Sequence, residues 1–171
     1  MSDIHYTRMA PRDIDAVIAI DTVAYPNPWS AATWRKELAA AERLHMVALD
    51  GARVVGHAGL LYVLDEVHIT TVATAEDRAS EGIATALLVR LLTAARDHGA
   101  TAATLEVRSG SARPQRLYGR FGFRPAGVRR KYYQDPIDDG IVMWLHDLDS
   151  EDVARRLADL SSGDLAAEGQ T

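Results

Sequence analysis

The sequence predicts a single α/β domain in which a mixed β-sheet carries helices on both faces. Its 171 residues, 47% hydrophobic and 25% charged, have the size and composition of one globular domain. Segments in which apolar and polar residues alternate are interspersed with segments of helical spacing, and no repeat is present. Three strands in succession precede a strand-helix-strand unit, which is the order of an antiparallel meander followed by a parallel crossover.

The first forty residues predict a strand followed by two helices. Residues 3–9 alternate between apolar and polar side chains, as a half-buried strand does. Pro11 then opens a helix whose apolar residues recur at helical spacing. The segment 25–29 holds two prolines within three residues and is therefore a loop. Ser30 caps a second helix that ends at about residue 40.

The meander that follows is predicted from three strand-like segments. Asp50 and Gly51 form a hairpin-turn sequence between the first two strands. Gly56 and Gly59 interrupt the middle strand and are candidate positions for β-bulges. The predicted strands cover residues 44–49, 53–63 and 66–74.

The second half predicts the crossover and a final strand pair. A long amphipathic helix extends from Gly82 to His98 and ends at Gly99. It is followed by a strand at 101–107, a helix at 111–121 and strands at 123–133 and 139–146. We assign residues 1–149 to the domain and 150–171 to a polar C-terminal tail, with one helical stretch from Val153 to Leu160.

Composition excludes several classes of function. The absence of cysteine excludes a disulfide scaffold, a thiolate metal site and a cysteine nucleophile. The six histidines show no metal-ligand spacing, so no metal is predicted, and His68 is given a structural role. A net charge of −5 without a basic surface cluster argues against nucleic acid. Without a secretory or membrane-spanning apolar segment, we expect a cytoplasmic protein that contacts no membrane.

The junction between strand 66–74 and the helix near Gly82 is the first candidate site. A strand that turns through a glycine-containing loop into a helix gathers unpaired backbone N–H groups around one point. Together with the helix dipole, these groups suit a pyrophosphate. Taken alone, Gly82 is more often a residue that simply starts a helix.

Glu106 and Tyr118 form the second candidate site. A carboxylate can take a proton from an attacking ammonium group, and a phenol can return one to a leaving thiolate. Two plainer interpretations stay open. In the first, Glu106, which shares a strand face with Thr104 and Arg108, is an ordinary solvated side chain. In the second, Tyr118 is a core aromatic residue whose hydroxyl group lies at the rim.

Taken together, these segments resemble the GNAT acyltransferases over residues 4–146. The order and the ungapped spacing of the motifs in the second half carry the resemblance most strongly. The motifs are PWS at 28–30, HITTVAT at 68–74, GIATALL at 82–88, LEVR at 105–108, LYGRFGFRPAGVRRKYY at 117–133 and IVMWLHDLD at 141–149. The resemblance implies the GNAT fold, a mostly antiparallel mixed sheet with a central splayed parallel pair and helices on both faces. It also implies acetyl-CoA as co-substrate and no metal.

Carried over position by position, the resemblance implies a complete set of site residues. Glu106 matches the general base of the family, and Tyr118 matches the general acid beside the sulfur atom. Ser111 stands where the family usually has an asparagine near the cofactor. The strand end that holds the pantetheine arm comprises Val72, Ala73 and Thr74. The pyrophosphate turn comprises Ser80, Glu81, Gly82, Ile83, Ala84 and Thr85.

The pyrophosphate turn departs from the usual pattern of the family. Ala79 stands where glutamine or arginine is common, Arg78 is displaced by one position, and Glu81 directly precedes Gly82. A carboxylate beside a pyrophosphate opposes binding unless it points outward. We therefore expect cofactor binding through the backbone that is weaker than is usual in the family.

The resemblance implies a protein N-terminus as the acceptor, specifically the N-terminal alanine of a small-subunit ribosomal protein. Candidate residues for lining the acceptor groove are Trp29, Trp34, Tyr132 and Tyr133. Candidate acids for attracting a basic peptide are Asp65, Glu66, Asp138 and Asp139. Two alternatives stay open: acetylation of a small-molecule amine, and a degenerate acetyl-CoA-binding protein without turnover.

Overall fold

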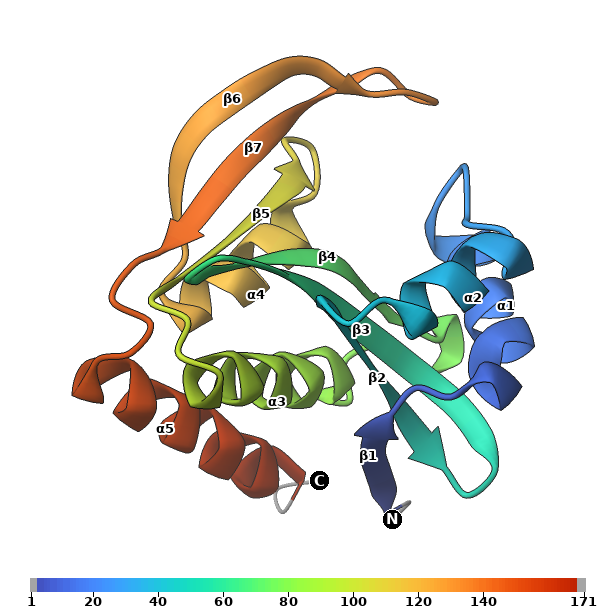
Figure 1. The fold of residues 1–171 in the computed structure, drawn as a ribbon, viewed down its shortest axis with the longest axis horizontal. Helices are drawn as coiled ribbons and strands as arrows, with labels where there is room; N and C mark the ends of the chain where they lie inside the picture. Colours follow the sequence, from blue (N-terminus) through green and yellow to red (C-terminus); the bar gives the residue numbers. More distant parts are fainter. Residues whose placement is uncertain (1–2, 169–171) are drawn as a thin grey trace.

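A computed structural model describes residues 3–168, which form a seven-stranded mixed sheet with helices on both faces (Figure 1). The strand order is β1-β2-β3-β4-β5-β7-β6, and this architecture confirms the predicted GNAT fold. The strands are β1 (Ile4–Arg8), β2 (Arg43–Asp50), β3 (Arg53–Val63), β4 (Glu66–Thr74), β5 (Ala102–Arg108), β6 (Arg124–Tyr133) and β7 (Asp138–Leu145). Residues 1–2 of the predicted domain and 169–171 of the predicted tail lie outside the described residues.

Two short helices cover one face of the sheet at its β2–β4 end (Figure 1). A 3-10 turn, η1 (Pro11–Asp13), leads into α1 (Ile14–Ala24). Pro11 is the first residue of this helical segment, as predicted. The second helix, α2 (Ala31–Ala39), begins after Ser30, whose hydroxyl accepts a hydrogen bond from the Thr33 N–H. This contact confirms the predicted helix cap.

The core under α1 and α2 contains buried polar groups among apolar residues. Trp34 is fully buried between the rings of His45 and His57. The His57 imidazole is also fully buried, and its Nε2 atom lies 2.6 Å from Oδ1 of Asp21 on α1. Gly59 leaves room for the His45 ring, since a Cβ atom there would lie 2.1 Å from it.

The opposite face of the sheet is covered by α3 (Ile83–Asp97), with α4 (Ala112–Phe121) and α5 (Glu151–Glu168) beside it (Figure 1). The apolar stripe of α3 buries four leucines completely, and these form the centre of the larger core: Leu87, Leu88, Leu91 and Leu92. Each fully buried leucine contributes about 1.5–3 kcal/mol relative to an exposed one. Among residues 3–168, no helix has both the length and the apolar character needed to cross a bilayer.

The segment after residue 149 packs into this larger core. The helix α5 is longer than the stretch from Val153 to Leu160 that the sequence predicts. Val153 and Leu157 are buried against the rest of the core, and Leu160 packs partly against it. Arg96 of α3 donates hydrogen bonds to the backbone carbonyls of Leu148 and Ser150, which fixes the start of the helix.

The feature that positions the site is the separation of β4 from β5. These two parallel strands pair only from Glu66 to His68 on β4 and from Ala102 to Thr104 on β5. A bulge at Thr70 distorts β4 just beyond the last pair, because Gly59 faces Thr71 and Leu60 faces Ile69. The strands diverge from this point, which confirms the predicted splayed pair. The hairpin of β7 and the largely exposed β6 completes the sheet beyond β5.

Candidate active site

A large cavity of about 1790 Å³ opens at the separation of the two strands. Its wall brings together every residue that the sequence analysis assigned to the site. From β4 these are Val72, Ala73 and Thr74; from the following turn and α3 they are Ser80, Glu81, Gly82, Ile83, Ala84 and Thr85; and from β5 and α4 they are Glu106, Ser111 and Tyr118. Ser111 immediately precedes α4.

The turn before α3 has the backbone shape of an anion-binding loop. Ser80 and Gly82 have positive φ angles of 69° and 80°, and Gly82 directly precedes the helix. Serine adopts this conformation at a cost in strain, which is common at functional sites. The first N–H groups of a helix have no acceptor within it. The turn therefore presents N–H groups, together with the positive end of the α3 dipole, to the cavity.

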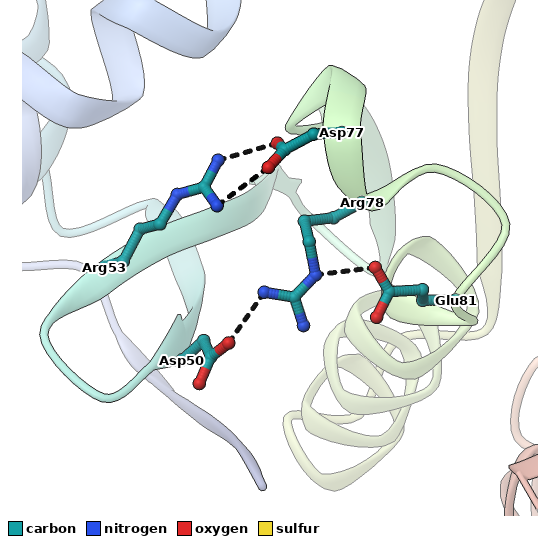
Figure 2. A network of polar contacts seen from close by, with 5 residues as sticks. All are labelled: Asp50, Arg53, Asp77, Arg78 and Glu81. Atoms are coloured by element: carbon teal, nitrogen blue, oxygen red, sulfur yellow. Dashed lines mark hydrogen bonds and ion pairs between the residues drawn. The ribbon is translucent and has the colours of Figure 1, made fainter. Parts of the chain in front are cut away.

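The carboxylate of Glu81 is held by Arg78 (Figure 2). The Nε atom of Arg78 lies 2.6 Å from Oε2 of Glu81, and its Nη1 atom lies 2.7 Å from Oδ2 of Asp50. These two partners raise the pKa of Arg78. Beside it, Arg53 binds Asp77 through both of its terminal nitrogens. The guanidinium group of Arg78 thus compensates the negative charge of Glu81 beside the turn.

Three arginines of α4 also line the cavity, and the sequence analysis missed them. They are Arg113, Arg116 and Arg120. Arg113 donates a hydrogen bond to the Ser80 hydroxyl, and Arg120 donates one to Thr85 Oγ1 at 2.6 Å. Their spacing of three and four positions along one helix is a signal that the sequence contained. The three arginines give this part of the wall a positive charge that suits phosphate groups.

Glu106 lies just beyond the last residue of β5 that pairs with β4, and its side chain is only 13% exposed. Its Oε2 atom is 2.6 Å from Nε2 of His68 on β4, and its Oε1 atom is 3.6 Å from Nε of Arg129 on β6. It is therefore held by neighbouring groups, unlike the freely solvated side chain of the plainer interpretation. Sequence reasoning gave His68 a structural role, and the structure places it in contact with the candidate base.

Tyr118 lies on α4 and is buried at the cavity wall. Burial is the main cause that raises its pKa, and the neighbouring phenols of Tyr25 and Tyr133 act in the same direction. Burial likewise raises the pKa of Tyr133 to about 12. A phenol in this environment keeps its proton well above neutral pH, which a general acid requires.

Aromatic residues from the loop before α2, from α2 itself and from β6 also line the cavity. All four predicted groove residues lie on its wall: Trp29, Trp34, Tyr132 and Tyr133. Trp34 is at the same time a fully buried core residue. The Tyr25 hydroxyl donates a 2.8 Å hydrogen bond to the Val72 carbonyl, which joins the loop before α2 to β4.

Three of the four predicted peptide-attracting acids are engaged within the fold, and Asp65 accepts a hydrogen bond from the Thr101 hydroxyl. Asp138 accepts hydrogen bonds from the Gly110 N–H, the Ser109 hydroxyl and the Asp139 N–H, and these bonds lower its pKa. Asp139 accepts a hydrogen bond from the Lys131 N–H. The carboxylates of Asp138 and Asp139 therefore brace turns, and their negative charge is partly neutralised by these donors.

A splayed parallel pair, an anion-binding turn at a helix N-terminus, and a carboxylate and a phenol on one cavity wall define an acyltransferase site. The model of the Acetyltransferase (GNAT) family matches residues 14–123, and the chain belongs to this family. It is therefore an acetyl-CoA-dependent N-acetyltransferase.

Similar proteins carry a more specific description. The [ribosomal protein bS18]-alanine N-acetyltransferase of Escherichia coli K12 is 32% identical over 78% of this chain and 90% of its own length. The protein of the same description from Salmonella typhimurium is 30% identical over 80% of this chain and 93% of its own. The crystal structure of the ribosomal-protein-S18-alanine N-acetyltransferase from Escherichia coli superimposes with a TM-score of 0.78 and 28% identity, covering 85% and 94% of the two chains.

Proposed function

We propose that this protein transfers the acetyl group of acetyl-CoA to the N-terminal α-amine of a protein, specifically the N-terminal alanine of ribosomal protein bS18. The observation that carries the proposal is the presence of Glu106 and Tyr118 on one cavity wall where β4 and β5 separate. The cavity exceeds the usual 300–1,000 Å³ of a small-molecule site, which favours a cofactor together with a peptide over a small amine. The names of the relatives support the choice of bS18.

The residues present fit acetyl-CoA as a substrate. The positive-φ turn at Ser80 and Gly82 and the first N–H groups of α3 would hold the pyrophosphate. Arg113, Arg116 and Arg120 would bind the remaining phosphate group. The end of β4 at Val72, Ala73 and Thr74 would hold the pantetheine arm through the backbone, as strand edges bind extended ligands.

The chemistry requires one proton acceptor and one proton donor. An α-amine has an ordinary pKa of about 8, so a carboxylate at Glu106 can remove its proton directly or through a water molecule. The free amine then attacks the thioester carbonyl, a C–N bond forms as the C–S bond breaks, and the nitrogen releases its second proton, which balances the proton that the phenol gives up. The Tyr118 phenol supplies a proton to the departing thiolate. Direct transfer needs no covalent enzyme intermediate, and much of the acceleration comes from positioning the two substrates.

The function is tested by following CoA release from acetyl-CoA with a panel of acceptors. The panel contains a peptide with the N-terminal sequence of bS18, the same peptide with a blocked α-amine, unrelated N-terminal peptides and small amines. We expect turnover of the bS18 peptide and none of its blocked form. Turnover confined to small amines would instead support the first alternative, and acetyl-CoA binding without any turnover the second.

The Glu106→Gln variant tests the proposed chemistry with the acceptor that the panel selects. Loss of a general base lowers kcat by about 100-fold or more. The loss is expected to be greatest at low pH, where the acceptor amine is mostly protonated. Thr104→Val changes the neighbouring residue on the same strand face and serves as the matched control. A pH–rate profile identical to that of the wild type would remove Glu106 from the role of base.

A further inference from the structure

The contact between His68 and Glu106 spans the point at which β4 and β5 separate. His68 faces Thr104 in the last backbone pair of the two strands. Glu106 is the next residue on the same face of β5, and its carboxylate lies 2.6 Å from the His68 imidazole. A side-chain hydrogen bond therefore continues the connection between the strands where their parallel pairing ends. The position of the candidate base depends on this bond.

Glu106 also separates two cavities. A second cavity of about 340 Å³ lies on the sheet face of β4, β5 and β7, and its wall includes His68, Val142 and Trp144. Of the residues that the structure describes, Glu106 alone lines both this cavity and the large one. The His68 side chain is 34% exposed and lines the smaller cavity. The imidazole is thus accessible to solvent from the smaller cavity.

Among residues 3–168, the His68 imidazole is the one side chain within hydrogen-bond distance of the Glu106 carboxylate, and Arg129 forms a longer ion pair with it. Arg129 on β6 approaches Oε1 at 3.6 Å, which is too long for a hydrogen bond, and its side chain is 56% exposed. Glu66 of β4 lines the smaller cavity beside His68, and Arg108 of β5 donates instead to the backbone carbonyls of Gln134 and Pro136. Tyr133 of β6 lies close enough for the Glu106 charge to help raise the pKa of its phenol.

We propose that His68 is a positioning residue, which aims Glu106 at the acceptor. This inference rests on the function proposed above. The neutral imidazole donates its Nε2–H to Oε2, so that Oε1 receives the proton from the acceptor ammonium: an N–H bond breaks and an O–H bond forms.

The pairing itself is tested without any acceptor. The Nε2–H signal of the His68 imidazole is followed by NMR in the wild type and in Glu106→Ala. We expect slow exchange of this proton with solvent in the wild type, where it is hydrogen-bonded to the carboxylate, and fast exchange in the variant. Equal exchange rates in both proteins would overturn the proposal. This comparison holds even if no acceptor in the panel is turned over, so failure of the proposed function is distinguished from failure of the pairing.

The catalytic consequence is tested with a double-mutant cycle on the acceptor that the panel selects. His68→Ala is expected to lower kcat/KM about tenfold in the wild type and less than twofold in Glu106→Gln, because it acts through the carboxylate. Its acetyl-CoA affinity stays at the wild-type value, since His68 lines only the smaller of the two cavities. Equal losses in both backgrounds would mean general structural damage and would overturn the proposal.

A conservative variant tests the hydrogen-bond donor. His68→Gln retains an N–H donor, and we expect it to recover most of the rate that His68→Ala loses. His98→Gln removes an exposed imidazole that packs at a tilt on Tyr62, and its rate should match that of the wild type. A His68→Gln rate as low as that of His68→Ala would contradict the proposed role.

Discussion

At the scale of single residues, burial gives Tyr118 the properties of a proton donor. The phenol is buried in the wall of the large cavity, and this burial raises its pKa above the ordinary value of about 10. A raised pKa means that the protonated form persists to higher pH. The rate should therefore show no loss from ionisation of Tyr118 between pH 7 and about pH 10.

Removing the hydroxyl group tests this residue directly. We expect Tyr118→Phe to lower kcat about tenfold to 100-fold because the thiolate leaves without its proton donor. The dissociation constant for acetyl-CoA should change about twofold at most, since the ring remains in place. Tyr62→Phe serves as the control, because it removes a hydroxyl group from a tyrosine on β3 whose ring packs on His98. Wild-type turnover in Tyr118→Phe would exclude the phenol as the acid.

At the scale of secondary-structure elements, the turn before α3 depends on the β2–β3 hairpin. Arg78 holds Glu81 and is itself held by Asp50 at the end of β2 (Figure 2). Without this guanidinium group, the Glu81 carboxylate would remain uncompensated beside the bound phosphates, where like charges repel. The effect is moderate because the Glu81 side chain is 44% exposed and solvent screens it.

We expect Arg78→Ala to raise the dissociation constant for acetyl-CoA about fivefold, measured by isothermal titration calorimetry at low salt. Adding Glu81→Gln should recover most of the lost affinity. Arg53→Ala, which breaks the neighbouring pair with Asp77, is the matched control and should have a smaller effect. If Glu81→Gln recovers nothing, then Arg78 acts on the ligand itself and not through Glu81.

The same turn shows what sequence reasoning could and could not reach. Gly82 and the start of α3 are local features, because a glycine and a helical spacing lie within a few residues of each other. The sequence analysis recognised that Glu81 opposes binding unless it is turned outward. Arg78, which compensates the charge of Glu81, is itself held by Asp50. Asp50 lies 28 positions from Arg78 in the sequence, and no local pattern predicts that contact.

At the scale of the whole molecule, α5 is part of the folding unit. Its apolar residues Val153, Leu157 and Leu160 follow the spacing of a helix with one buried face. The sequence shows this stripe, but the surrounding acidic and polar residues led to its description as a tail. The helix contacts both α3 and α4, and α4 carries the arginines and Tyr118 of the cavity.

Leu157→Ala is expected to lower the free energy of unfolding by about 2–4 kcal/mol, because it leaves a cavity in the larger core. Denaturant unfolding measures this change, and kcat at 25 °C should stay at the wild-type value while the protein remains folded. Asp159→Ala lies on the exposed side of the same helix and should change stability by less than about 0.5 kcal/mol. Equal effects of the two substitutions would mean that α5 does not pack as described.

The order of the strands and helices follows from local sequence patterns, whereas contacts between distant residues depend on the register in which the strands pair. The order of strands and helices was predicted correctly because each element has its own periodicity. Glu106 and Tyr118 were selected by the resemblance, and their meeting on one wall agrees with it. The bond from Glu106 to His68 joins residues 38 positions apart across two parallel strands. It depends on where those strands stop pairing, which no spacing within either strand reveals.

The ion pairs of Arg53 and Arg78 beside the turn before α3 have a thermodynamic consequence. A loop that must become ordered around its ligand loses conformational entropy at the moment of binding, and affinity falls accordingly. Here Arg53 and Arg78 fasten the segment from Asp77 to Glu81 to the neighbouring hairpin. That entropy is lost when the chain folds, so the proposed binding of the nucleotide end of acetyl-CoA at this turn would require little further ordering of the loop.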